Sequence, residues 1–322
     1  MRKNINILCT LGPSTLNKNF INFALNNNVS LLRLNLSHLS SNQIDTLLKK
    51  KLNKYLDNIC IDTEGAQIRT KVSKKKYFKK NSISELYTNS IKFSLYPHDV
   101  FSKLKIGDEL DVGFEGLRIK LLKKVKDKFK FKTVNPGYLE KNKGVHVINR
   151  KIKLQYITEK DLNIINLSKK YNIKNYALSF CNSVQDIEKF DKLIGNKNKI
   201  FKIETKHALK NFNKIVKKGK NFLIDRGDLS KEIGIEQIPI AQRKILQIAK
   251  RYKNKNIFIA TNFLESMISK PYPTRAEVND IYNSLELGAK GLVLAAETAI
   301  GKYPIECIKL INKIIKAYNY NR

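Results

Sequence analysis

The sequence lacks several features that would assign it to a particular class of protein. It has no run of 18 or more apolar residues, which argues against a membrane-spanning helix. The apolar segment 5–9 is interrupted by Gly12-Pro13 and is too short for a secretory signal. Its four cysteines show no C-x-x-C spacing, and three lie in or beside apolar strand-like runs. This pattern indicates buried free thiols in a reducing compartment, so a cytoplasmic protein with no membrane partner is expected.

Acidic residues are scarce as well. There are 28 Asp and Glu against 62 Lys and Arg, which gives a formal net charge of +34. A nucleic-acid-binding protein tends to concentrate its basic residues on one face or in one arm. Here they are scattered over every predicted helix, among many Asn and Ile, as is typical of a strongly AT-biased genome. The charge would attract anionic substrates at low salt, but no specific nucleic-acid partner is predicted.

Two glycine-rich phosphate loops, G-x-G-x-x-G and G-x-x-x-x-G-K-[ST], are also absent, which excludes phosphate binding by either device. What is present is a regular alternation of strand-like and helical patterns. The strand-like runs are residues 6–9, 31–36, 58–62, 175–180, 200–204, 222–225, 256–261 and 291–295. The helical patterns are residues 17–25, 42–55, 159–171, 184–193, 241–252, 275–287 and 305–318. Eight strands with interleaved helices predict an α/β fold, a parallel (β/α)8 TIM barrel, with an open doubly wound sheet as the alternative.

One segment breaks the alternation. Between residues 70 and 146 the sequence shows short strand patterns with turn signals such as Asn135-Pro136-Gly137, and residues 129–134 alternate with period two. We therefore expect a small antiparallel β domain at 70–146, inserted as a lid into a barrel formed by 1–69 and 147–322. Its connections, near Thr70 and Lys143-Gly144, would be hinges.

Four blocks of sequence carry a resemblance to a known family. Residues 260–277, ATNFLESMISKPYPTRAE, resemble the segment ATQMLESM…PTRAE of pyruvate kinases. In the same order as in that family, residues 32–38 (LRLNLSH) resemble ARLNFSH, residues 61–70 (IDTEGAQIRT) resemble LDTKGPEIRT, and residues 225–230 (DRGDLS) resemble ARGDLG. The family has a (β/α)8 barrel with an inserted lid. The resemblance implies a glycolytic kinase that transfers a phosphoryl group from phosphoenolpyruvate to ADP, giving pyruvate and ATP.

Polar residues end or follow several predicted strands, where a (β/α)8 barrel gathers its functional groups. Lys202 and Glu204 are two residues apart, so they point to the same side of a strand and need partners there. Glu204 and Asp228 suit Mg²⁺, which takes one or two protein carboxylates together with substrate oxygens and water. By resemblance, Lys202 would stabilise the transferring phosphoryl group and the enolate, and the amides of Gly227 and Asp228 would bind the substrate carboxylate.

The matched positions imply further roles. Arg33 would contact the transferring phosphate, and Thr261 would bind substrate and take part in protonating enolpyruvate. The implied nucleotide-binding residues are Pro13, Asn35, His38, Arg69 and Lys143. The implied potassium ligands are Asn35, Ser37, Asp62 and the Thr63 carbonyl.

The sequence also departs from the family's motifs. Glu64 stands where lysine is usual and reverses a charge close to the anionic substrates, so restoring lysine should tighten their binding. Gln67 replaces a glutamate that accompanies potassium dependence, which leaves open whether K⁺ is needed. Phe114 replaces one of a pair of aspartates, a change expected to weaken nucleotide binding, and Ala295 replaces a serine.

The resemblance ends near the C-terminus of the sequence, without the family's third, often allosteric domain. We therefore expect no activation by sugar phosphates and a homodimer.

Two alternative functions stay open. A Mg²⁺-dependent enolate-forming lyase or aldolase would use Lys202, Glu204 and Asp228 but would not need the lid. A catalytically inactive basic binding protein would account for the net charge and for Glu64. The kinase is favoured over both because the sequence keeps all the residues that the resemblance assigns to phosphoryl transfer: Arg33, Asn35, Ser37, Asp62, Thr63, Lys202, Glu204, Asp228 and Thr261.

Overall fold

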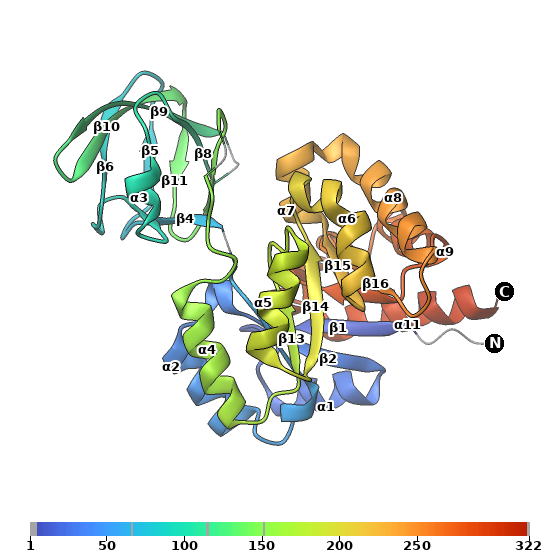
Figure 1. Cartoon of the computed structure of the whole chain (residues 1–322). Coiled ribbons are helices and arrows are strands. Elements are labelled where there is room, and N and C mark those ends of the chain that lie inside the picture. The colour runs from blue at the N-terminus through green and yellow to red at the C-terminus, as the bar shows by residue number, and fades with distance from the viewer. Residues whose placement is uncertain (1–4, 66, 114–115, 151, 321–322) are drawn as a thin grey trace. The chain divides into compact units, whose positions relative to one another are not determined.

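The computed structural model describes residues 5–65, 67–113, 116–150 and 152–320. It divides into two compact units, shown in Figure 1. The larger comprises Met1–Gly65 and Glu159–Arg322, and the smaller comprises Ala66–Thr158. The inserted unit therefore begins before and ends after the expected bounds of 70 and 146.

The larger unit is built around a closed barrel of parallel strands, in the order β1-β17-β16-β15-β14-β13-β3-β2. The strands are β1 (Asn6–Thr10), β2 (Val29–Asn35), β3 (Ile59–Asp62), β13 (Asn175–Leu178), β14 (Asn198–Ile203), β15 (Asn221–Asp225), β16 (Asn256–Ala260) and β17 (Gly291–Leu294). Each lies within or overlaps one of the apolar runs found in the sequence. The predicted (β/α)8 barrel is confirmed, and the open doubly wound sheet is wrong.

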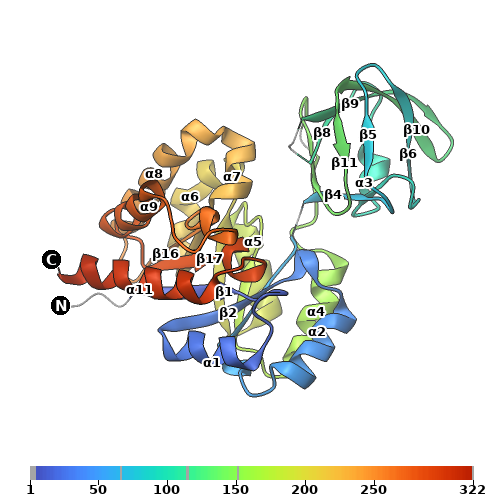
Figure 2. The same ribbon diagram turned by 180° about the vertical axis from the view of Figure 1, so that it is seen from behind.

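Helices surround this barrel on its outside (Figures 1 and 2). They are α1 (Lys18–Asn26), α2 (Ser41–Thr46), α4 (Glu159–Lys170), α5 (Val184–Ile194), α6 (Lys206–Lys218), α7 (Arg226–Ile233), α8 (Ile238–Lys250), α9 (Arg275–Glu286), α10 (Ala296–Ala299) and α11 (Pro304–Tyr320). Short turns complete the unit: η1 (Leu36–His38), η2 (Leu47–Lys51), η3 (Leu56–Asn58), η4 (Ile235–Gln237) and η5 (Glu265–Ile268). Among the described residues, no helix combines the length and the apolar character needed to cross a bilayer.

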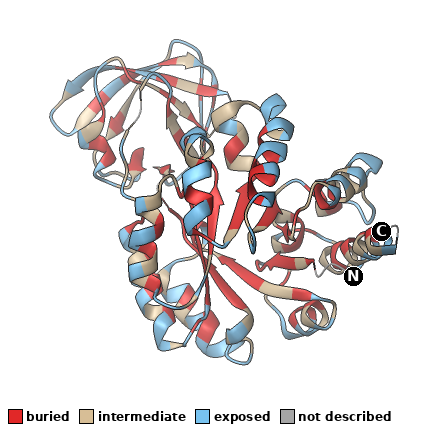
Figure 3. Ribbon diagram, turned by 45° about the vertical axis from the view of Figure 1, so that its right-hand side comes forward, coloured by how far each residue is buried: buried red, intermediate tan, exposed pale blue. Residues whose placement is uncertain are grey.

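Helix α6 shows why these segments form helices and where the chain carries its basic residues. Thr205 caps its N-terminus by accepting a hydrogen bond from Ala208 N. Its buried residues, Ala208, Phe212, Ile215 and Val216, recur at helical spacing and form one apolar face against the barrel. Five exposed lysines occupy the remaining surface: Lys206, Lys210, Lys214, Lys217 and Lys218. The same division between buried and exposed faces is visible on the other helices in Figure 3.

The barrel interior contains an apolar layer to which seven strands contribute buried residues: Leu8, Cys60, Ala177, Ile200, Leu223, Phe258, Ala260 and Val293, with Leu31 of β2 partly buried against them. Since side chains alternate along a strand, the residue two positions further on points to the same side. That step leads from Leu31 to Arg33, from Cys60 to Asp62, from Ile200 to Lys202 and from Leu223 to Asp225. The apolar layer is thus followed by a polar one at the carboxyl ends of the strands.

The smaller unit is a second closed barrel, in the order β10-β6-β7-β4-β12-β8-β9, with a two-stranded sheet of β11 and β5. Its elements are β4 (Ile68–Lys71), β5 (Lys76–Phe78), β6 (Ile83–Tyr87), β7 (Ser94–Tyr96), α3 (Val100–Lys103), β8 (Glu109–Val112), β9 (Leu117–Val125), β10 (Lys128–Asn135), β11 (Gly137–Leu139) and β12 (Gly144–Val147). Most pairings are antiparallel, while β6 and β7 pair in parallel. The period-two pattern of β10 is seen directly, because Phe129 and Phe131 are buried and Lys130 and Lys132 are exposed.

The expected hinges at Thr70 and Lys143-Gly144 are wrong. Strands β4 and β12 pair with each other, with Arg69 opposite Gly144. Thr70 N donates to the Lys143 carbonyl at 2.8 Å, and Thr70 Oγ1 accepts from Lys143 N at 2.9 Å. These positions therefore belong to, or adjoin, two paired strands of the smaller barrel, where the backbone is held by hydrogen bonds and cannot act as a hinge. The chain passes between the two units closer to Gly65 and Thr158.

Candidate functional site

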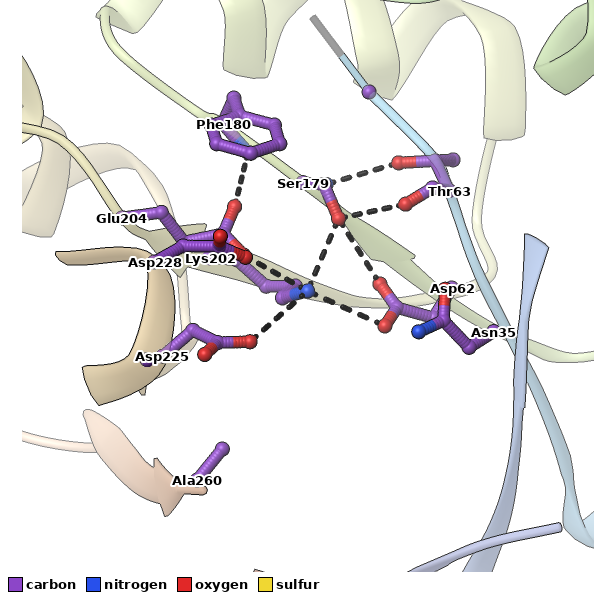
Figure 4. A network of polar contacts seen from close by, with 12 residues as sticks. Asn35, Asp62, Thr63, Ser179, Phe180, Lys202, Glu204, Asp225, Asp228 and Ala260 are labelled. Atoms are coloured by element: carbon purple, nitrogen blue, oxygen red, sulfur yellow. Dashed lines mark hydrogen bonds and ion pairs between the residues drawn. The ribbon is translucent and has the colours of Figure 1, made fainter. Parts of the chain in front are cut away.

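Lys202 occupies the centre of the polar layer (Figure 4). Its Nζ lies 2.9 Å from Glu204 Oε1, 3.3 Å from Asp62 Oδ2 and 3.4 Å from Asp225 Oδ2. It also donates to Ser179 Oγ at 3.1 Å. The lysine side chain is only 5% exposed. A buried ammonium group surrounded by three carboxylates is held in one position, so it can act as a fixed positive charge.

The carboxylates determine the protonation state of this lysine. Burial by itself would lower the pKa of Lys202, but Asp62, Glu204 and Asp225 outweigh it and raise that pKa above the usual range. Burial raises the pKa of Glu204; Lys202 opposes this shift, and Asp225 and Asp228 reinforce it. Lys202 is therefore charged at neutral pH, while burial and the neighbouring carboxylates disfavour the ionised form of Glu204.

Asp62 links this lysine to Arg33. Arg33 Nε donates to Asp62 Oδ2 at 2.5 Å, and Arg33 Nη1 donates to Thr10 Oγ1 at 2.9 Å. Burial would raise the pKa of Asp62, but the charges of Arg33 and Lys202 outweigh it and lower that pKa. Two predicted catalytic cations, Arg33 and Lys202, thus share one buried carboxylate.

Three carboxylates gather on the other side of Lys202. One oxygen from each of Glu204, Asp225 and Asp228 lies within 4.8 Å of the others. Glu204 is fully buried, and its Oε1 has no hydrogen-bond partner, whereas its Oε2 accepts from Phe180 N at 2.5 Å. Glu204 Oε1 is ion-paired with Lys202 but makes no hydrogen bond, and Mg²⁺ prefers carboxylate oxygens as ligands. The residues present therefore fit a magnesium ion.

Thr261 follows β16 in an unusual backbone conformation, with φ of 72°. A left-handed backbone is strained for a β-branched residue, so the surroundings must hold it. Gly227 N donates to Thr261 Oγ1 at 2.9 Å, and Arg226 Nε donates to the Thr261 carbonyl at 3.2 Å. Arg226 in turn pairs with Asp280 at 2.6 Å. The Gly227 amide, which is predicted to bind the substrate carboxylate, thus donates to the Thr261 hydroxyl group in this structure.

The four expected potassium ligands also lie together. Asn35 and Asp62 are directly opposite each other on β2 and β3. The Asn35 side chain accepts from Ser37 N at 3.0 Å, and the carbonyl of Thr63, the residue after β3, accepts from Ser179 Oγ at 2.6 Å. Both Asp62 oxygens are engaged, since Ser179 Oγ lies 3.3 Å from Oδ1. In this structure protein groups donate to the Asn35, Asp62 and Thr63 oxygens of this set.

The expected nucleotide-binding residues fall into two groups. Pro13 follows β1, and Asn35 and His38 lie at the end of β2 and in η1, all in the larger unit. Arg69 and Lys143 belong to the smaller unit, on or beside the paired strands β4 and β12. Within the smaller unit, Arg69 lies opposite Gly144, the residue after Lys143.

The structure explains one departure from the family's motifs. Glu64 is buried, and its Oε2 pairs with Lys160 Nζ at 2.8 Å. Lys160 therefore compensates the negative charge of Glu64 within the protein itself. Gln67 immediately precedes β4, and Ala295 caps α10. Phe114 lies outside the described residues.

Sequence reasoning missed three contributors. Asp225 stands at the start of the DRGDLS motif, but its spacing from Leu223 places it on the inward side of β15. Ser179 follows β13, and a serine after an apolar strand has many ordinary explanations. The Arg226–Asp280 pair joins residues 54 positions apart, and no local pattern indicates such a contact. Counting two residues on from the inward-facing Ala177 and Leu223 identifies Ser179 and Asp225.

A (β/α)8 barrel with buried cations and a carboxylate cluster at the carboxyl ends of its strands is the architecture of an enzyme that stabilises negative charge on a substrate. Comparison with known proteins is more specific. Residues 2–308 match the family model described as pyruvate kinase, barrel domain. The chain belongs to the pyruvate kinase family.

Individual relatives agree with this assignment. The chain is 34% identical to the pyruvate kinase of Thermotoga maritima over 96% of its own length and 70% of that protein. It is 35% identical to the pyruvate kinase of Methanocaldococcus jannaschii over 98% of its length, again covering 70% of the relative. A Staphylococcus epidermidis pyruvate kinase is 31% identical over 98% of the chain and is covered for 56% of its length.

Proposed function

We propose that this protein is a pyruvate kinase, which transfers the phosphoryl group of phosphoenolpyruvate to ADP and yields pyruvate and ATP. The single observation that supports this most strongly is the buried Lys202, fixed between Asp62, Glu204 and Asp225. Phosphoryl transfer is mainly a matter of positioning and of neutralising charge, so a rigid cation beside a carboxylate cluster is what the reaction needs.

The roles proposed for the individual residues follow from their charges and surroundings. Lys202 and Arg33 would bind the oxygens of the transferring phosphoryl group, and Lys202 would then balance the charge of the enolate. Glu204 and Asp228 would hold Mg²⁺, which when bound neutralises charge on phosphoenolpyruvate and the nucleotide. The Gly227 and Asp228 amides would bind the substrate carboxylate, and the Thr261 hydroxyl would take part in protonating the enolate.

The nucleotide and the monovalent cation complete the proposal. Pro13, Asn35 and His38 of the larger unit and Arg69 and Lys143 of the smaller unit would contact ADP. Asn35, Ser37, Asp62 and the Thr63 carbonyl would bind K⁺. Because protein donors satisfy Asp62 and Thr63 in this structure, K⁺ would have to displace the Ser179 hydroxyl from the Thr63 carbonyl or share that oxygen with it.

The decisive experiment measures pyruvate formation from phosphoenolpyruvate and ADP with Mg²⁺, in the presence and absence of K⁺. Wild type is compared with Lys202→Met and with the control Lys218→Met, which removes a lysine that is 56% exposed on α6. Removing Lys202 should lower kcat by at least about a hundredfold, while the control should leave it unchanged. A stimulation by K⁺ would show that potassium dependence is retained with Gln67 at this position.

Other outcomes would favour the alternatives. A folded wild-type protein that binds Mg²⁺ and phosphoenolpyruvate without turnover would indicate another enolate chemistry, such as that of a lyase or aldolase. A protein that neither turns over nor binds these ligands would indicate a basic binding protein. Turnover that survives in Lys202→Met would contradict the role given to this lysine.

Two further parts of the proposal concern the whole protein. We propose a homodimer, and the exposed apolar side chains Tyr272 and Ile300 are candidates for its interface. Light scattering should then give about twice 37.1 kDa.

We also propose a cytosolic location, because the four cysteines are free and buried and need no oxidising compartment. Cell fractionation would test it.

A further inference from the structure

We propose that Asp225 is a third carboxylate ligand of the divalent-cation site of Glu204 and Asp228, and that it raises the affinity of the substrate-free protein for divalent cations. The inference deepens the proposed function, on which it rests. Asp225 has no counterpart among the roles implied by resemblance, since the ARGDLG motif has alanine at this position. It is therefore a property of this chain's own sequence.

The position of Asp225 follows from the geometry of the barrel. It is the last residue of β15 and points inward, two residues after Leu223 of the apolar layer. Glu204 follows the neighbouring strand β14, and Asp228 lies in the first turn of α7. One oxygen of each lies within 4.8 Å of the others. At metal–oxygen distances of about 2.1 Å, adjacent ligands of an octahedral ion are about 3.0 Å apart and opposite ligands about 4.2 Å, so the three carboxylates would have to draw together around a bound ion.

The charges around the cluster favour a divalent ion. Asp62, Glu204, Asp225 and Asp228 supply four carboxylates, and Arg33 and Lys202 supply two buried cations. With all four carboxylates ionised, as metal ligands are, the difference is two negative charges. Lys231 also contacts Asp228 at 2.9 Å, but its side chain is 36% exposed and solvent screens the pair. Without Asp225 the excess would be one charge, and the attraction for a divalent ion would be weaker.

A second observation concerns Glu204 Oε1. This oxygen is buried and ion-paired with Lys202 Nζ at 2.9 Å, but it makes no hydrogen bond. Buried carboxylate oxygens are normally hydrogen-bonded or bound to metal. Asp225 is 3.4 Å from Lys202, further than Glu204 is, so serving as a counter-ion to the lysine accounts for only part of its placement.

The experiment measures binding of Mn²⁺ to the full chain without phosphoenolpyruvate or ADP, by the electron paramagnetic resonance signal of free Mn²⁺. Asp225→Ala restores the residue of the family motif, and Asp225→Asn removes the charge at nearly constant shape. Both should bind Mn²⁺ at least about tenfold more weakly than wild type. The control Glu188→Gln removes an exposed carboxylate of α5 and should leave the affinity unchanged. Circular dichroism confirms that each variant is folded.

A second variant separates direct ligation from a general electrostatic effect. In Asp225→Cys a ligating thiolate would favour soft metals, so the ratio of Cd²⁺ to Mn²⁺ affinity should rise at least about tenfold, with cadmium–thiolate absorption in the ultraviolet. The four native cysteines are buried, and wild type shows their background. If the cysteine variant does not fold, Asp225→His measured with Ni²⁺ serves the same purpose.

The results discriminate clearly. Mn²⁺ affinity within about twofold of wild type in the alanine and asparagine variants would overturn the proposal. Weaker Mn²⁺ binding in those two variants without a gain of Cd²⁺ or Ni²⁺ would also overturn it, because the effect would then be electrostatic. These measurements use no substrate, so a failure here is distinct from a failure of the kinase assay.

Discussion

At the scale of single residues, Glu64 shows how a departure from a family motif is accommodated. Its carboxylate is buried and pairs with Lys160, and its backbone N–H donates to Asp161 Oδ1 at 2.7 Å. From the sequence alone, a lysine at this position is expected to improve the binding of anions. The structure indicates the opposite, because that lysine would be buried beside Lys160.

We therefore predict that Glu64→Lys destabilises the protein, by about 3–5 kcal/mol, because it leaves two like charges close together in a buried place. The free energy of unfolding in urea measures this effect. The charge-swapped double variant Glu64→Lys/Lys160→Glu should recover part of the loss, since it restores an ion pair. A single variant as stable as wild type, with a lower KM for phosphoenolpyruvate, would restore the interpretation made from the sequence.

Asp280 provides a second prediction at this scale. It pairs with Arg226, which in turn donates to the Thr261 carbonyl. Asp280→Asn should release Arg226 and let Thr261 leave its left-handed conformation, lowering kcat by roughly tenfold. Mn²⁺ affinity should stay at the wild-type value, and Asp280→Glu should retain more activity than Asp280→Asn. An unchanged kcat in Asp280→Asn would show that the pair does not position Thr261.

At the scale of elements, the segment that carries the strongest resemblance has a clear structural purpose. Thr274 and Glu277 form a capping box at the start of α9. Glu277 also accepts hydrogen bonds from Ser266 N at 2.8 Å and Ser266 Oγ at 2.6 Å. The carboxylate thus joins η5 to α9 immediately after Thr261. Part of this motif therefore serves the local fold and not the chemistry.

A pH-dependent effect on stability follows. Partial burial would raise the pKa of Glu277, but hydrogen bonds from Ser266 and Thr274 outweigh it and lower that pKa. A lowered folded-state pKa gives stability that is present above the unfolded-state pKa and lost as the pH falls through the folded value. Glu277→Gln should therefore be about 1 kcal/mol less stable than wild type at pH 7, and the difference should shrink below about pH 4.

Urea denaturation at pH 7 and at about pH 3 checks this expectation. Glu286→Gln, at the exposed far end of the same helix, serves as the matched control and should show no such pH dependence. A difference between wild type and Glu277→Gln that stays constant between the two pH values would mean that the carboxylate charge is not responsible.

The elements also show where sequence reasoning succeeds and where it fails. The barrel strands were predicted because each is a short apolar run flanked by turn or helix signals, as in β15 and β16. The two-residue period of a strand is enough to predict that the side chains of Lys202 and Glu204 point to the same side. The hinges were misplaced because the pairing of β4 with β12 is a contact between distant segments. Arg226–Asp280 and Glu64–Lys160 escaped notice for the same reason, since nothing local to either partner specifies the other.

At the scale of the whole molecule, the dominant property is the net charge of +34. The structure shows how the chain carries it without losing its core. Exposed lysines lie on the outer face of α6 in the larger unit, and on β9, β10 and the turn between them in the smaller unit, where Lys120, Lys123, Lys124, Lys126, Lys130 and Lys132 are exposed. Charges dispersed in this way create a diffuse field and not a groove shaped for one nucleic acid.

We predict that a fluorescent oligouridine binds this protein at about 50 mM salt and is released by about 200 mM, because such binding depends on counterion release. Fluorescence anisotropy across this range measures it. Kinase turnover should respond differently, since Lys202 and Arg33 are buried and screened little by salt. At about 200 mM salt, turnover should therefore persist without bound RNA. Saturable RNA binding at that concentration, combined with no turnover, would instead favour the basic binding protein over the kinase.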